Sequence, residues 1–162
     1  MTKLESLENE AIAENVEVID YPFSSNRIKG LYCDGTVALN ENIRTSSEKS
    51  CVLAEELGHY HTAYGNIICQ SSVSNQKQEL RARAWAYDKM VGLTGIIDAY
   101  KHGCRSTHDT AEYLDVTEEF LLNALKHYRR KYGIHTQIDN YIIYFEPSLG
   151  VLNMYSYSYF TL

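Results

Sequence analysis

The sequence predicts an α+β fold, in which a small antiparallel β-sheet packs on a bundle of helices. This prediction rests on a hairpin signal near the start of the chain, helix-start signals followed by helical spacing in the middle, and short strand-like segments at the end. The 162 residues are enough for one domain with its own core. Because no internal repeat, low-complexity tract or linker interrupts the chain, we predict a single domain over residues 1–162.

The first part of the chain predicts a helix, a strand and a hairpin. Residues 4–14 have the apolar spacing of a short amphipathic helix, and residues 16–19 are rich in β-branched side chains, which favours a strand. A hairpin follows over residues 28–39, where two apolar segments flank Asp34-Gly35. That pair suits the left-handed backbone angles of a two-residue turn, so this is the clearest hairpin signal in the sequence.

The middle of the chain predicts two long helices. Thr45 followed by Glu48 fits an N-terminal capping box, so we predict a helix over residues 46–64. A second helix is predicted over residues 76–91. Its small residues favour close packing against the first helix.

The last part predicts three further helices and one or two strands. A short helix is expected over residues 94–102, and a helix-turn-helix-like pair over residues 107–132. Residues 141–145 are expected to form a strand. In the tail, tyrosines alternate with serines over residues 155–159, a spacing typical of a strand or an extended arm.

Composition and charge exclude several classes of protein. No apolar run approaches the ~18 residues that cross a bilayer, and the acidic N-terminus lacks the pattern of a signal peptide, so we expect a cytoplasmic protein without membrane contact. The net charge of -6 argues against nucleic-acid binding as the main role. The cysteines form no C-x-x-C pair, which argues against a zinc ribbon or a disulfide framework and favours free thiols: Cys33, Cys51, Cys69 and Cys104.

The chemistry is expected on the helix of residues 46–64, in the segment Glu55-Glu-Leu-Gly-His59. Residues four apart lie one turn above each other on a helix, so Glu55 and His59 point the same way and are placed to bind one metal ion. Glu56 lies between them, as the general base does in the H-E-x-x-H helix of zinc peptidases. This segment therefore predicts a zincin-like active-site helix. Gly58 lowers helix propensity, which indicates close approach of another backbone or of a substrate.

A third metal ligand is expected from the next helix. Glu79 is the best candidate, since Ala82 and Ala86 on the same stripe would let this helix approach the first one closely. His61 is an alternative ligand. With Glu55 in place of the usual histidine, the site carries less positive charge, which keeps Zn²⁺ possible and favours Mn²⁺ somewhat more.

These segments resemble the ImmA/IrrE family of metallopeptidase-like proteins, especially the compact versions found in prophages and other mobile elements. The resemblance is carried by L-A-E-E-L-G-H-Y-H at residues 53–61, E-x-x-A-x-A-W-A at residues 79–86 and V-A-L-N at residues 37–40. It implies a zinc-dependent endopeptidase that cuts a helix-turn-helix repressor. By position it implies that Glu55, His59 and Glu79 are metal ligands and that Glu56 is the catalytic base.

Several alternatives stay open at this stage. One alternative hypothesis is a catalytically inactive relative that binds the repressor without cutting it. Another is a DNA-binding regulator. Direct DNA binding is disfavoured, because the second helix of the pair begins with Glu118 and Glu119, which phosphates repel. Tyr60, His61 or Tyr64 are possible oxyanion stabilisers, and strand residues 36–39 form a possible edge for an extended substrate.

Overall fold

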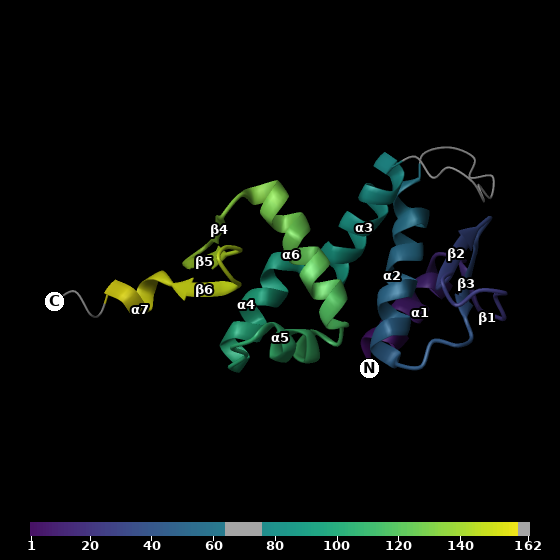
Figure 1. Ribbon diagram of the computed structural model, residues 1–162, viewed down its shortest axis with the longest axis horizontal. Helices are drawn as coiled ribbons and strands as arrows, with labels where there is room; N and C mark the ends of the chain where they lie inside the picture. The colour runs from purple at the N-terminus through teal and green to yellow at the C-terminus, as the bar shows by residue number, and fades with distance from the viewer. Residues whose placement is uncertain (64–75, 159–162) are drawn as a thin grey trace. The chain divides into compact units, whose positions relative to one another are not determined.

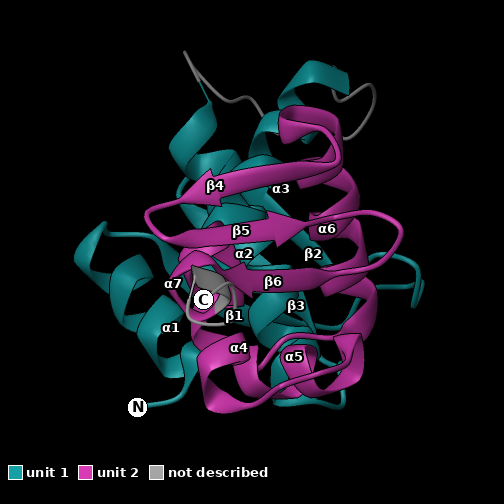
Figure 2. Ribbon diagram, turned by 90° about the vertical axis from the view of Figure 1, so that its left-hand side faces the viewer, with its two compact units in different colours: residues 1–90 teal, residues 91–162 magenta. Residues whose placement is uncertain are grey.

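The computed structural model describes residues 1–63 and 76–158 of the chain. These residues divide into two compact units, residues 1–90 and residues 91–162, which Figure 2 shows in different colours. Each unit combines helices with a small three-stranded sheet. The α+β class is therefore confirmed, whereas the single domain over residues 1–162 stays a prediction.

The sheet of the first unit contains the predicted hairpin. Its strands are β1 (Glu17–Tyr21), β2 (Gly30–Cys33) and β3 (Thr36–Asn40). Strands β2 and β3 pair antiparallel across the Asp34-Gly35 turn. Asp34 has φ 44° and Gly35 has φ 78°, the left-handed angles that the sequence predicts for this turn.

The order of this sheet corrects one expectation. The strands lie in the order β1-β3-β2, and β1 pairs parallel with β3, so the sheet is mixed rather than purely antiparallel. Strand β3 is central and hydrogen-bonded on both sides. The expectation that residues 36–39 form a substrate-binding edge is therefore wrong, and β1 and β2 are the outer strands.

Helix α2 is the centre of the first unit. The helices are α1 (Lys3–Ala13), α2 (Ser46–Thr62) and α3 (Gln76–Met90), and α2 contacts α1, α3 and the strands β2 and β3 (Figure 1). The Thr45 side chain accepts a hydrogen bond from the backbone N–H of Glu48, which fixes the start of α2. The Glu48 carboxylate pairs with Lys29 at 3.1 Å. The helix ends at Thr62, and the predicted last residue, residue 64, lies outside the described residues.

Helices α2 and α3 cross at two small residues. A Cβ atom built on Gly58 would lie 2.3 Å from the carbonyl oxygen of Ala82, so no side chain fits at this position. Ala82 and Ala86 on α3 are fully buried. The crossing confirms that Gly58 permits close backbone approach and that the alanine stripe of α3 faces α2.

The second unit holds the helix pair and the second sheet. Its elements are α4 (Gly92–His102), α5 (Thr107–Leu114), α6 (Glu118–Tyr132), β4 (His135–Ile138), β5 (Tyr141–Tyr144), β6 (Gly150–Asn153) and α7 (Met154–Ser158). The strands form an antiparallel sheet in the order β4-β5-β6. The sequence predicts β5 but not β4, whose four residues include only one β-branched aliphatic side chain.

The tail departs from the expected strand or arm. Strand β6 ends at Asn153, and the chain then turns into helix α7. The side-chain oxygen of Asn153 accepts a hydrogen bond from the backbone N–H of Tyr155, at 3.1 Å, which favours a helix start at this point. This local hydrogen bond explains why the alternating pattern fails for Tyr155. Tyr159 lies outside the described residues.

The thiols agree with expectation only in part. Cys51 is buried and Cys104 is half-buried, and neither is disulfide-bonded. Cys33 is disulfide-bonded, so the expectation of free thiols is wrong for this residue. Sequence spacing alone does not reveal such a pairing.

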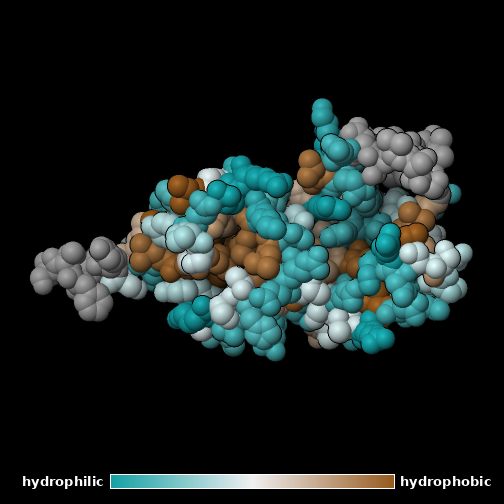
Figure 3. Space-filling view, in the orientation of Figure 1, coloured by the Kyte–Doolittle hydropathy of each residue, from teal (hydrophilic) through white to brown (hydrophobic). Residues whose placement is uncertain are grey.

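None of the helices in residues 1–63 and 76–158 is long and apolar enough to cross a bilayer. Figure 3 shows mostly hydrophilic side chains over the visible faces of α2 and α3.

Candidate functional site

Glu56 projects from α2 onto the outer edge of strand β2. The backbone N–H of Asn40 donates to the carbonyl of Lys29, and this hydrogen bond fixes the alternation of the antiparallel ladder. Gly30 and Tyr32 consequently turn their backbone N–H and C=O groups away from β3. The backbone N–H of Tyr32 donates a hydrogen bond to the Glu56 carboxylate. Glu56 is therefore held between α2 and the edge of the sheet.

The environment of Glu56 alters its acidity. Burial raises the pKa of its carboxyl from 4.5 to about 7, because a desolvated carboxylate is less stable than the neutral acid. The hydrogen bond from Tyr32 opposes this shift, while the nearby charges of Glu55 and Glu79 add to it. A carboxyl with a pKa near 7 both accepts and releases protons at neutral pH, which is the property of a general base.

His59 and Glu79 meet across the crossing of α2 and α3. The Nε2 atom of His59 lies 3.4 Å from Oε1 of Glu79. The other oxygen of Glu79 lies 3.8 Å from Nε of Arg83, one turn further along α3. The contact follows from the small residues at the crossing, which let Glu79 reach α2. The structure thus brings together two of the three predicted metal ligands.

Two of the predicted ligands are side chains of types that bind divalent metals. One histidine nitrogen and one carboxylate oxygen, as in His59 and Glu79, are ligands that zinc sites use. Within the described residues, no three His, Cys, Asp or Glu side chains form a group that could hold a metal ion. Glu55 is half-buried on α2, one turn before His59. The roles of Glu55, His59 and Glu79 as metal ligands stay predictions.

Tyr60 and His61 are directed to other partners. The hydroxyl of Tyr60 donates to a carboxylate oxygen of Glu14 at 3.1 Å. His61 stacks on Trp85, with ring centroids 4.5 Å apart, and its Nε2 lies 3.5 Å from the Glu10 carboxylate. These contacts lead away from the His59–Glu79 pair, so they favour structural roles for both side chains. Tyr64 lies outside the described residues.

Sequence reasoning missed the contribution of strand β2. Gly30 and Tyr32 both face Glu56, one through the space that a missing side chain leaves and the other through its backbone N–H. A glycine inside a strand signals close approach of another group, and this signal was available at Gly30. A backbone N–H carries no sequence signal, because every residue except proline has one.

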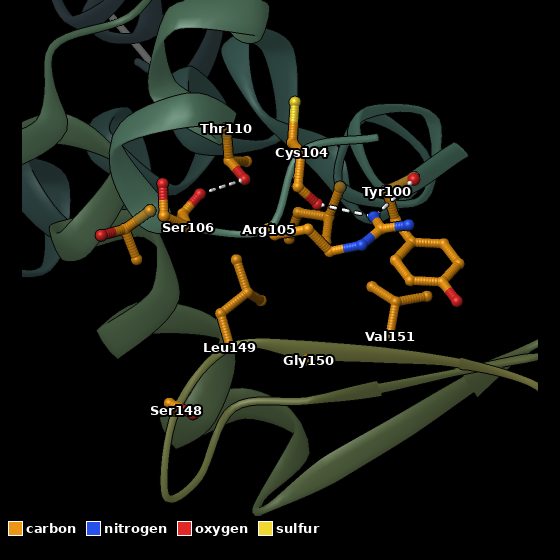
Figure 4. Close-up of a pocket in the computed structure, with 11 residues that line it drawn as sticks. Tyr100, Cys104, Arg105, Ser106, Thr110, Ser148, Leu149, Gly150 and Val151 are labelled. Atoms are coloured by element: carbon orange, nitrogen blue, oxygen red, sulfur yellow. Dashed lines mark hydrogen bonds between the residues drawn. The ribbon is translucent and has the colours of Figure 1, made fainter. Parts of the chain in front are cut away.

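The second unit contains a separate cavity of about 460 Å³ between the α4–α5 connection and strand β6 (Figure 4). Arg105 lies across it, donating to the carbonyl oxygens of Tyr100 and Cys104. Leu149, just before β6, and Val151, in β6, face it. Its lining includes no histidine, aspartate or glutamate. Among the described residues, this cavity therefore lacks the carboxylate and imidazole side chains that most often act as general bases.

Comparison with known proteins identifies the family. The family model described as the IrrE N-terminal-like domain, a peptidase family, matches residues 11–126. No curated protein and no solved structure matches the chain. The matched segment includes α2 with Glu55, Glu56 and His59, and α3 with Glu79. Since the match covers more than half of the sequence and confirms the resemblance, the chain belongs to the IrrE N-terminal-like family of metallopeptidases.

Proposed function

We propose that this protein is a metal-dependent endopeptidase, with Glu56 as the catalytic base and Glu55, His59 and Glu79 as metal ligands. The observation that carries the proposal is the juxtaposition at the α2–α3 crossing. A histidine–glutamate pair 3.4 Å apart lies beside a glutamate whose pKa is raised to about 7. A buried acid with a perturbed pKa near potential metal ligands is typical of a hydrolytic site.

The residues have distinct roles in this proposal. A divalent ion, Zn²⁺ or Mn²⁺, would supply Lewis-acid polarisation of the scissile carbonyl when bound. Glu56 accepts the proton of the attacking water at its carboxylate and passes it to the leaving nitrogen. The raised pKa supports both transfers, since the carboxyl neither holds the proton too tightly nor releases it too early at neutral pH.

Strand β2 supports a binding mode for an extended substrate. It is an outer strand of its sheet, and Gly30 turns its backbone groups toward the side on which Glu56 lies. Because Glu56 already accepts a hydrogen bond from the Tyr32 amide, a peptide at this edge would pair with the backbone groups of Gly30 and would be fixed there close to the base. This edge replaces the one expected at residues 36–39, because those residues belong to β3, the central strand of the sheet.

The resemblance to the ImmA/IrrE family motivates the choice of substrate. We infer a helix-turn-helix repressor of a phage or another mobile element as the protein substrate, met in the cytoplasm. The family supports a protein substrate in general. The repressor itself is the expectation to be tested.

A second candidate function is binding of the repressor without cleavage. Two observations favour it: Glu55 stands where zinc peptidases carry a histidine, and residues 1–63 and 76–158 contain no three-ligand group. In such a protein Glu56→Gln would leave the effect on the repressor unchanged. In a peptidase the same variant would abolish it.

Metal content tests the site first. We expect about one zinc or manganese ion per chain in protein purified without chelator, and loss of that ion in His59→Ala. His61→Ala is the matched control, because His61 lies on the same helix but contacts Trp85 and Glu10. Equal metal content in wild type and His59→Ala would contradict the proposed ligands.

Cleavage tests the chemistry next. Wild type and Glu56→Gln are incubated with a peptide library made by digesting the proteins of a cell lysate. New N-termini are identified by mass spectrometry. We expect cleavage that falls by at least about 100-fold in Glu56→Gln, the usual contribution of a general base. If the metal-loaded wild type cuts neither the peptides nor the native proteins of the lysate, the result would favour repressor binding without cleavage.

A further inference from the structure

Strand β2 carries a glycine at the point where Glu56 meets the sheet. Gly30 opposes Leu39 in the ladder, and its φ is not in the left-handed region. Any residue can adopt such a backbone, and a glycine inside a strand lowers its stability. The backbone conformation therefore does not require glycine at this position. The requirement comes instead from the lack of room for a side chain.

The neighbouring side chains fill the space that a side chain at residue 30 would take. A Cβ atom built on Gly30 would lie 2.9 Å from Cγ of Glu56, 3.1 Å from its Oε1, and 2.7 Å from Cγ1 of Val52. Carbon atoms in protein interiors pack at about 3.5–4.0 Å. Both Val52 and Glu56 project from α2, one turn apart, so α2 presses two side chains against the bare backbone of Gly30.

Two features of β2 thus act together on the same carboxylate. The missing side chain of Gly30 admits the Glu56 side chain to the edge of the strand. The backbone N–H of Tyr32, two residues on and facing the same way, holds the carboxylate there by a hydrogen bond. Adding even one methyl group at residue 30 would push the carboxylate away from that N–H.

We propose that Gly30 is a positioning residue for Glu56: it forms a slot in strand β2 that fixes the Glu56 carboxylate against the Tyr32 amide. The catalytic consequence rests on the proposed function, whereas the geometric one does not. A base displaced by about 1 Å loses a large part of its effect, because proton transfer requires a short and aligned contact. Gly30 would then support the rate of catalysis without contacting the metal ligands.

The test compares Gly30→Ala with wild type in two independent measurements. The first is the Tyr32 amide resonance in ¹H–¹⁵N NMR spectra of the full chain. We expect it to move in Gly30→Ala toward its position in Glu56→Ala, because the hydrogen bond is lost in both. The second is cleavage of a peptide found with the library: kcat should fall at least about tenfold while zinc content stays unchanged.

Two further variants separate the positioning of Glu56 from a general loss of stability. Gly30→Ala/Val52→Ala removes the 2.7 Å contact with Val52 but keeps the contact with Glu56. We expect it to recover thermal stability while the Tyr32 resonance and kcat stay altered. Gly150→Ala is the matched control, since Gly150 also lies in a strand but its added Cβ would be 4.0 Å from the nearest atom. It should change none of these measurements.

The outcomes distinguish the two levels of the proposal. An unmoved Tyr32 resonance in Gly30→Ala would overturn the positioning role, as would full recovery of that resonance in the double variant. If the wild type cuts no peptide, the peptidase function fails, but the resonance still decides whether Gly30 positions Glu56. If Gly30→Ala does not fold, the double variant provides the same resonance. A moved resonance with unchanged kcat would overturn the catalytic consequence alone.

Discussion

At the scale of single residues, the candidate site is defined by carboxylates that lie near one another. Glu56 is surrounded by the charges of Glu55 and Glu79, and burial further disfavours its ionised form. The hydrogen bond from the Tyr32 amide stabilises this ionised form. A folded protein that keeps such a group close to its pKa at neutral pH carries a cost in stability, and that cost is measurable.

The acidity of Glu56 predicts a pH dependence of stability in the metal-free protein. Its pKa is raised from 4.5 to about 7, so between these values the folded protein holds a proton that the unfolded chain has released. The free energy of unfolding therefore falls as the pH rises through this window. At about 1.4 kcal/mol per pH unit, the upper limit of this loss is roughly 3 kcal/mol.

Urea unfolding at pH 5 and pH 8, with chelator present, measures this loss. Glu56→Gln should reduce the difference between the two pH values, because the amide does not titrate. Glu41→Gln changes an exposed glutamate and should leave the difference as in wild type. The same difference in wild type and Glu56→Gln would show that burial of Glu56 does not shape the pH dependence.

At the scale of elements, α2 organises the first unit through its small and polar positions. Thr45 fixes where the helix begins, and Gly58 fixes how closely α3 approaches. The distance between His59 and Glu79 follows from that approach, since they lie on the two helices that cross there. The proposed metal binding would thus be coupled to the packing of a pair of helices.

Gly58→Ala is expected to destabilise the protein although alanine is the better helix former. The added Cβ would lie 2.3 Å from the carbonyl oxygen of Ala82, and backbone on the opposite helix cannot move aside locally. We expect a loss of at least about 2 kcal/mol in the free energy of unfolding. Urea denaturation followed by circular dichroism measures it.

Gly95→Ala provides the comparison for helix propensity. Gly95 also lies in a helix, but its added Cβ would meet only the flexible end of Leu114, at 3.2 Å. We expect a change within about 1 kcal/mol, since the gain in propensity offsets the tight contact. If Gly58→Ala is as stable as Gly95→Ala, the close crossing of α2 and α3 is not needed for the fold.

At the scale of the whole molecule, charge argues against a role in binding DNA. The chain carries a net charge of -6, and α6 begins with Glu118 and Glu119 in its first turn. The basic residues of α6 come in its last turn, where Arg129 pairs with Glu146. Helix-turn-helix proteins place their contacts with bases near the start of the second helix.

We therefore expect no tight binding of duplex DNA. Fluorescence anisotropy with a labelled duplex at physiological salt should give a dissociation constant weaker than about 10 µM. Submicromolar binding with steep salt dependence, weakened by Arg130→Gln, would instead support the DNA-binding regulator. Glu119→Gln gives the opposite control, because it removes a repulsive charge from the start of α6.

The local features of this protein follow directly from its amino-acid sequence. Turn chemistry at Asp34-Gly35, the cap at Thr45 and the small residues at positions 58, 82 and 86 act over a few residues, so they can be read from the chain. Most helix bounds and the hairpin follow from them, as does the spacing of Glu55, Glu56 and His59 along one helix. The family was recognisable for the same reason, since its motifs lie within short segments.

Which of these groups meet is set by the packing of the helices and the sheet. The central place of β3, the contact of His59 with Glu79 and the different partners of Tyr60 and His61 depend on residues far apart in the chain. The acidity of Glu56 and its slot at Gly30 arise from desolvation and steric contact, which exist only once α2 packs on the sheet. Local patterns specify elements, whereas burial and long-range contact give their side chains chemical properties.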